Sequence, residues 1–144
     1  MQTDLYIDGN WVPSQSAQRF DVMNPATEDV IASVASADIF DADLALDAAS
    51  TAMQEWAARS PRDRSEVLRK AWELMTARLP EFARLITLEN GKANADAMGE
   101  ATYAAEFFRW FAEEAVRVDG LIAHAPASGA RIIVQHKPAG LAVL

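Results

Sequence analysis

The chain has 144 residues and a formal net charge of −8, from 13 Lys and Arg residues against 21 Asp and Glu residues. This length corresponds to one domain, and a hydrophobic content of 51% supplies a core, which argues against intrinsic disorder. The negative charge repels phosphate backbones and anionic lipids, so neither nucleic-acid nor membrane partners are expected. The absence of cysteine excludes disulfides, thiolate metal sites and a cysteine nucleophile from these residues. No signal-peptide pattern is present, and the cytoplasm is the expected location.

Two antiparallel strand pairs are expected first. Residues 4–12 predict a β-hairpin, because their central Asp-Gly-Asn tolerates the positive φ of a tight turn. Residues 19–23 and 30–34 are expected to pair with each other, since the segment between them contains Pro25 and other turn-forming residues.

Three helices are expected next. Hydrophobic residues recur at spacings of three and four after Asp38, a good N-cap. Ser60 and Pro61 have the pattern of an N-cap and first helical residue, and Pro80 opens a short helix that Gly91 closes. The stripes expected to be buried in the first two helices are Ile39, Ala42, Leu46, Ala49, Met53 and Trp56, then Val67, Leu68, Ala71, Trp72 and Met75. The same periodicity places Asp41, Asp43, Asp47 and Gln54 elsewhere on the surface.

The longest helix is predicted over residues 95–119, with Gly120 as its stop. Its buried stripe is expected to be Ala97, Ala101, Ala104, Phe108, Phe111, Ala115 and Val118. A strand is expected over 131–135. Residues 140–144 are continuously apolar, which is typical of a strand buried on both faces of a parallel sheet. A terminal carboxylate there would be a buried charge without a partner, so we expect a larger domain to follow; a frayed apolar tail is the alternative.

No motif of a phosphate-binding loop, a nucleophile elbow or a zinc protease is present in the sequence. His124 and His136 have no Cys, Asp or Glu at ligand spacing, and a surface or interface role is expected for both. Adjacent acids such as Glu113 and Glu114 point about 100° apart on a helix, so they indicate a solvated face.

Two features could carry function. Residues 88–92 end a helix with Glu89 at the unfavourable end of the helix dipole, which indicates either a plain C-cap or an oxygen-lined cation site. Tyr103, Phe107 and Trp110 follow one another at spacings of four and three and form an aromatic stripe. Such a stripe belongs either to the core or to a substrate pocket.

Several segments, in order, resemble the N-terminal part of the NAD(P)-dependent aldehyde dehydrogenases, and within them the succinate-semialdehyde dehydrogenases. These segments are residues 6–11 (YIDGNW), 24–27 (NPAT), 88–92 (LENGK), 103–119 (YAAEFFRWFAEEAVRVD) and 137–140 (KPAG). The resemblance implies an α/β fold in which small antiparallel strands and four helices lead into the first strand of a Rossmann-like sheet. The corresponding divisions are an N-terminal layer of hairpins and helices (1–120), an oligomerisation strand segment (121–138) and the first strand of the truncated cofactor-binding domain (139–144).

The resemblance also implies an activity. The family oxidises an aldehyde by attack of a cysteine thiolate, hydride transfer to NAD or NADP, and thioester hydrolysis with a glutamate as general base. The catalytic cysteine and the cofactor-holding segments of such proteins are not among these residues. No catalytic residue is therefore assigned, and these 144 residues alone are expected to be inactive.

Three non-catalytic roles follow from the resemblance. Glu89, with a backbone oxygen near Val22 or Met23, would help to bind a structural monovalent cation. Tyr103, Phe107 and Trp110 would form part of the substrate entrance for a small aldehyde. The segment from His124 to His136 would pair with another subunit, which implies a homodimer or homotetramer. The competing hypothesis is a self-contained acidic helical module that binds another protein through the aromatic stripe.

Overall fold

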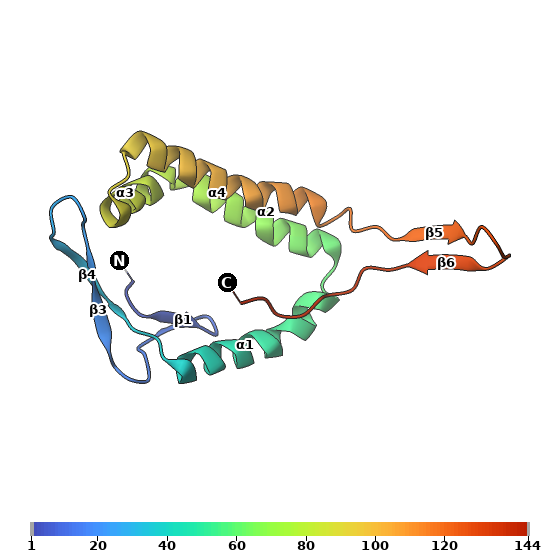
Figure 1. Cartoon of the computed structure of the whole chain (residues 1–144), viewed down its shortest axis with the longest axis horizontal. Coiled ribbons are helices and arrows are strands. Elements are labelled where there is room, and N and C mark those ends of the chain that lie inside the picture. The colour runs from blue at the N-terminus through green and yellow to red at the C-terminus, as the bar shows by residue number, and fades with distance from the viewer. Residues whose placement is uncertain (1, 144) are drawn as a thin grey trace.

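The computed structural model describes residues 2–143, in which three antiparallel strand pairs accompany four helices. In chain order they are β1 (Leu5–Ile7), β2 (Asn10–Val12), β3 (Arg19–Met23), β4 (Val30–Ala35), α1 (Ile39–Ala58), α2 (Pro61–Ala77), α3 (Leu79–Asn90), α4 (Asn94–Glu114), β5 (Leu121–His124) and β6 (Arg131–Val134). Each strand pair forms its own two-stranded sheet. In Figure 1 the chain forms an open frame, with α1 on one side, α2 and α4 on the other, and β1 between them.

The first strand pair confirms the predicted hairpin. β1 and β2 are joined by Asp8 and Gly9, whose φ angles of 50° and 76° are both positive, as a tight two-residue turn requires. Tyr6 lies opposite Trp11, and their ring centroids are 5.0 Å apart. Arg19 links this region to β3, since its guanidinium donates to Asp4 at 2.8 Å.

The second strand pair is also confirmed. β3 and β4 pair from Arg19 opposite Ala35 to Met23 opposite Val30, with an irregularity between Val22 and Met23. In the connecting turn, the side-chain oxygen of Asn24 accepts a hydrogen bond from the Ala26 amide at 3.0 Å. This bond stabilises the turn that connects the two strands.

The helix ends follow the predicted caps. The Asp38 side chain accepts from the amides of Phe40 and Asp41, and Ser60 accepts from the amide of Asp63 at 3.1 Å. Gly91 closes α3 in the left-handed conformation, with φ of 76°. These caps satisfy backbone groups at the helix ends, where no preceding or following turn supplies partners.

Helix α4 packs against both α2 and α3. The closest packing uses small side chains, because alanines allow helix backbones to approach. The buried alanines of this region are Ala83 on α3 and Ala97, Ala101, Ala105 and Ala112 on α4. Phe111, which was expected in the buried stripe of the long helix, is instead 55% exposed.

The predicted buried stripe of α1 is wrong for this structure. Ile39 is 71% exposed, and Leu46 and Trp56 are each 40% exposed. Within residues 2–143, the element that contacts α1 most is the three-residue strand β1, which is too short to cover a helix of 20 residues. Amphipathic periodicity marks a face that favours burial, but burial needs a second element packed on it.

The predicted end of the longest helix is also wrong. α4 begins at Asn94 and ends at Glu114, five residues before the expected end, with Ala115 as its C-cap. Gly120 therefore does not stop the helix. It lies before β5, where a Cβ atom would overlap the carbonyl oxygen of Val134. The close approach of the two strands, rather than helix capping, accounts for glycine there.

Strands β5 and β6 form an arm that extends away from the helices (Figure 1). β6 confirms the strand expected near residues 131–135. β5 lies within residues 121–138, where the family resemblance implied an oligomerisation strand, although the residue pattern itself predicted no strand there. The arm exposes apolar side chains, including Ile122 at 75% and Ile133 at 64%. Its outer edges have no strand partner among the described residues.

The strand expected at the C-terminus is absent from residues 139–143, and Leu144 lies outside the described residues. Leu141 and Val143 are 44% and 80% exposed. A strand needs a neighbour that satisfies its backbone hydrogen bonds, and none lies beside this segment within residues 2–143. Among the helices of residues 2–143, none has the length and hydrophobicity that a membrane span requires.

Candidate functional site

An aromatic surface lies on one side of α4. We use this name for Tyr103, Glu106, Phe107, Trp110 and Phe111, which line a shallow groove of about 330 Å³. The helical spacing of three and four residues places these side chains on neighbouring turns of one face. The three residues expected to form a substrate wall are therefore brought together.

The aromatic surface is open to solvent in residues 2–143. Tyr103, Phe107 and Trp110 are 66%, 46% and 64% exposed. Tyr103 and Phe107 pack edge to face, with ring centroids 4.9 Å apart and an interplanar angle of 79°. An exposed group of large aromatic rings of this kind marks a surface that contacts a ligand or further polypeptide.

The aromatic surface carries one charged side chain, and it is engaged in an ion pair. Glu106 is its only ionisable lining residue apart from Tyr103, and its carboxylate pairs with Arg109 at 2.7 Å. Arg109 lies over the Trp72 ring, 5.6 Å from the centroid, on the side of α4 that faces α2. Among the described residues, the groove thus offers apolar contact but no cation of its own for a substrate carboxylate.

The residues of the second predicted site lie at the end of α3 and near the turn after β3. Pro25, in the turn after β3, lies close to Gly91, since a Cβ atom there would be 3.1 Å from Pro25 Cγ. This contact brings the end of α3 and the turn after Met23 together. Glu89 is exposed, and Met23 is 44% exposed.

The same helix end holds an unsatisfied polar atom. Thr87 Oγ1 is buried and has no hydrogen-bond partner within the described residues. In that part of the chain, no three His, Cys, Asp or Glu side chains cluster as metal ligands. Side-chain donors alone therefore do not form a complete cation site, and backbone oxygens would have to supply the other ligands.

A polar arrangement that the sequence analysis missed lies at the start of α1. Asp41 was expected on the surface, but its relative exposure is 2%. It accepts hydrogen bonds from Ser14 Oγ at 2.7 Å, the Gln15 amide at 3.0 Å and the Asp38 amide at 3.0 Å. Asp at the third position of a capping box was the only local signal, and it does not reveal the partners from residues 14 and 15.

These hydrogen bonds explain the acidity of Asp41. The Asp38 amide is the largest cause that holds the pKa of the Asp41 carboxyl below its ordinary value. Burial acts in the opposite direction, and the bonds from Ser14 and Gln15 add to the lowering. Asp41 is thus an ionised structural group rather than a proton donor at neutral pH.

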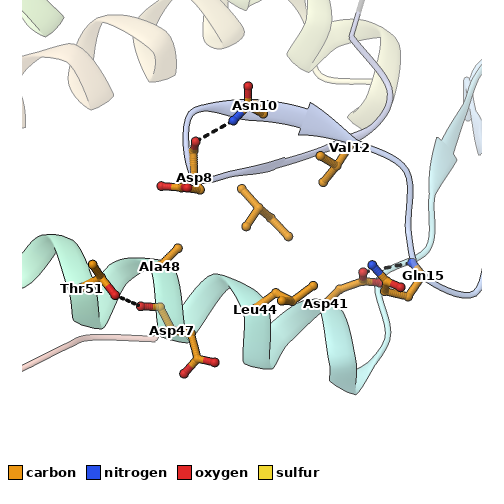
Figure 2. A pocket seen from close by; sticks show the side chains of 10 residues that line it. Asp8, Asn10, Val12, Gln15, Asp41, Leu44, Asp47, Ala48 and Thr51 are labelled. Carbon is orange, nitrogen blue, oxygen red and sulfur yellow. Dashed lines mark hydrogen bonds between the residues drawn. The ribbon is translucent and has the colours of Figure 1, made fainter.

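Asp41 also lies at one end of a groove between the β1–β2 hairpin and α1 (Figure 2). The groove has a volume of about 490 Å³, and Asp47 and Thr51 lie toward its other end. The Thr51 hydroxyl donates to the Asp47 carbonyl at 3.0 Å, so this pair is engaged within the helix. The groove therefore lies where the hairpin joins α1, and the described residues that line it do not form a catalytic group.

The histidines remain apart from these features. His124 lies on the arm and His136 follows it, and both are exposed. Neither belongs to a cluster of potential metal ligands in residues 2–143. No acid–base pair is formed with either ring in that region.

Comparison with known proteins places the chain among enzymes. A profile of the aldehyde dehydrogenase family matches residues 11–144. A succinate-semialdehyde dehydrogenase of Paenarthrobacter nicotinovorans is 50% identical over 115 residues, which are 80% of this chain and 26% of that protein. A glutarate-semialdehyde dehydrogenase of Pseudomonas aeruginosa is 40% identical over 138 residues, covering 94% of this chain and 28% of that protein.

Solved structures agree with this grouping. A crystal structure described as an E. coli NADP-dependent enzyme superimposes with a TM-score of 0.87 and 36% identity, covering 92% of this chain and 27% of that one. PnpE in complex with nicotinamide adenine dinucleotide superimposes with a TM-score of 0.83 and 31% identity, covering 88% of this chain and 26% of that one.

The chain belongs to the aldehyde dehydrogenase family. Members of this family act on small aldehydes, and the solved relatives support NAD(P) binding in the family. The chain spans about a quarter of the length of the relatives that it matches. The expected α/β architecture of small strand pairs followed by four helices is confirmed by these structural neighbours.

Proposed function

We propose that this chain is the N-terminal part of an NAD(P)-dependent enzyme that oxidises a semialdehyde, such as succinate semialdehyde, to its carboxylate. The single observation that carries the proposal is the ordered match of residues 11–144 to the family. The names of two relatives, a succinate-semialdehyde and a glutarate-semialdehyde dehydrogenase, support a substrate with an aldehyde at one end and a carboxylate at the other.

In this proposal the aromatic surface forms one wall of the substrate entrance. Tyr103, Phe107 and Trp110 would contact the hydrocarbon part of the substrate and exclude water from the entrance. Because Glu106 is the charged residue of the groove, the cation that binds the substrate carboxylate would come from outside the described residues. The wall therefore orients the substrate without selecting its charge.

The described residues do not fit a bound dinucleotide. The sequence has no G-x-G-x-x-G motif, and residues 2–143 contain no parallel strand pair whose ends could hold a pyrophosphate. The sequence also lacks the cysteine that would attack the aldehyde. These residues would therefore contribute to the reaction by positioning the substrate. The attacking cysteine and the groups that hold the dinucleotide would lie on other polypeptide.

Two further parts of the structure have proposed roles. The carboxylate of Glu89 and the backbone near Met23 would supply part of a monovalent cation site, supported by the contact between Gly91 and Pro25. The β5–β6 arm would pair with another subunit in a homodimer or homotetramer, supported by its exposed isoleucines and unpaired edges.

The proposed activity is tested with the full-length protein. NAD(P)H formation is measured with succinate semialdehyde, glutarate semialdehyde and an uncharged aliphatic aldehyde. We expect turnover with the semialdehydes, the highest kcat/KM with succinate semialdehyde, and no NAD(P)H from these 144 residues alone. Preference for the uncharged aldehyde would contradict the proposed substrate, and absence of turnover with every aldehyde would contradict the proposed activity.

The role of the aromatic surface is tested by Trp110→Ala in the same protein. Loss of an aromatic contact of about 0.5–1.5 kcal/mol predicts a roughly two- to tenfold rise in KM. Phe40→Ala is the matched control, since Phe40 is 66% exposed and lies on α1, away from this surface. An equal change of KM in the two variants would contradict a place for Trp110 in the substrate entrance.

A protein-interaction module is the second candidate function, favoured by the exposure of Tyr103 and Trp110. It predicts that the 144-residue chain is a monomer that unfolds cooperatively. Aggregation or a strand-exchanged oligomer in size-exclusion chromatography would favour the enzyme fragment instead.

A further inference from the structure

The segment after β6 passes the end of α1 and the start of α2 (Figure 1). Another pocket lies at this place in the fold. We call it the basic pocket. It has a volume of about 480 Å³, and the lining residues that matter here are Met53, Trp56, Arg64, Val118, His136 and Lys137. This volume is in the range of sites for small organic ligands.

The basic pocket has the opposite charge to the chain as a whole. Arg64 and Lys137 line it, and no Asp or Glu does, although the chain carries a net charge of −8. Neither cation forms an ion pair within the described residues. Arg69, by contrast, pairs with Glu66 at 2.7 Å and also with Glu73.

The position of Arg64 is set by a neighbouring loop. Its guanidinium donates one hydrogen bond to the Arg59 carbonyl oxygen, between α1 and α2. A guanidinium has five N–H donors, so further donors stay available for a ligand. The nearby carboxylate of Glu55 is paired with Arg59 at 2.9 Å, which reduces its repulsion of an anion in the pocket.

The remaining wall is apolar. Trp56, Met53 and Val118 line the pocket beside the two cations. Cations next to an aromatic ring and aliphatic side chains suit a ligand that joins an anionic group to a small apolar part. A bare ion would use only the charged half of this lining.

We propose that the basic pocket binds a small organic oxyanion, a carboxylate or phosphate ester, with Arg64 and Lys137 holding its charged group and Trp56 contacting its apolar part. His136 adds a ring N–H donor at the same rim. This site is separate from the aromatic surface of α4, and no residue lines both. The proposal does not depend on the substrate assigned above.

The test is isothermal titration calorimetry of the full-length protein with two probes, benzoate and phenyl phosphate. We expect saturable binding of at least one probe, and its identity distinguishes a carboxylate site from a phosphate site. Arg64→Gln and Lys137→Gln are each expected to raise Kd at least tenfold, because charge-assisted hydrogen bonds are lost. Trp56→Leu should weaken binding of both probes, while Lys137→Arg should restore most of the affinity.

Arg62→Gln is the matched control. Arg62 lies on the same helix, two residues before Arg64, but lines the groove between α2 and α4. It should leave Kd within about twofold of the wild type, as expected for a charge on the surface. Absence of saturable binding of both probes, or equal weakening by R62Q, R64Q and K137Q, would overturn the proposal. Lys137→Gln keeps the test valid if Arg64→Gln does not fold, since Lys137 is exposed and outside the helices.

Discussion

The Ser14 hydroxyl donates a 2.7 Å hydrogen bond to the Asp41 carboxylate, across 27 positions of the chain. Ser14 is 4% exposed and Asp41 is 2% exposed. Asp41 also accepts from the amides of Gln15 and Asp38, and the Ser14 hydroxyl also contacts the Ser16 hydroxyl at 3.0 Å, so both buried groups have their partners. The pair joins the loop after β2 to the first turn of α1. Since α1 has few other contacts among the described residues, this pair positions the helix relative to the β1–β2 hairpin.

Replacement of Asp41 should therefore destabilise the protein. Asp41→Asn replaces one of the two accepting carboxylate oxygens with an NH2 group, which cannot accept a hydrogen bond, and so leaves a buried donor without its partner. We expect a clear fall in the Tm measured by circular dichroism. Asp43→Asn is the control, because Asp43 is exposed on the same helix, and its Tm should stay near that of the wild type. A similar fall in both variants would contradict the role given to Asp41.

The lowered pKa of Asp41 predicts a loss of stability in acid. A carboxyl whose pKa is lower when folded contributes its stability fully above the unfolded value, and loses it as the pH falls through the folded value. For Asp41 the loss begins below about its ordinary pKa of 3.8. The free energy of unfolding of Asp41→Asn should thus depend less steeply on pH in this range. Parallel curves for variant and wild type, from urea titrations at each pH, would rule this out.

Two glycines provide a matched pair of substitutions. Gly91→Ala forces a residue with a Cβ atom into φ of 76°, close to Pro25 Cγ, and should cost about 1 kcal/mol or more. Gly99 lies inside α4 with nothing within 4 Å of a Cβ atom, so Gly99→Ala should stabilise by up to about 1 kcal/mol. Chemical denaturation measures both, and changes of the same sign would contradict the argument.

The cation proposal at Glu89 predicts a specific salt effect. Addition of NaCl or KCl should raise the Tm above that in choline chloride of equal ionic strength, because a bound ion stabilises the folded state. The free energy of unfolding would rise by about 2.7 kcal/mol at an ion concentration of 100 times Kd. Glu89→Gln should abolish this difference, whereas Glu113→Gln, on the exposed face of α4, should retain it. An equal change of Tm in NaCl, KCl and choline chloride would contradict the proposed cation site.

Local structure could be predicted from the sequence where neighbouring residues decide it. Asp8 and Gly9 form the expected turn, Asp38 and Ser60 cap helices, and Gly91 ends α3. Each case depends on backbone conformation or a hydrogen bond within about three residues, so the residue type carries the information. The face shared by Tyr103, Phe107 and Trp110 follows from helical spacing in the same way.

Burial and pairing were decided only by the tertiary structure. Periodicity predicted a buried stripe on α1, yet Ile39 is exposed, and Asp41, expected on the surface, is buried against Ser14. Likewise Leu141 is apolar but forms no strand in the described residues. The sequence by itself determined which residues can cap, turn or share a face, because those properties are local. Which face is covered depends on distant segments, since burial and strand pairing are properties of two elements in contact.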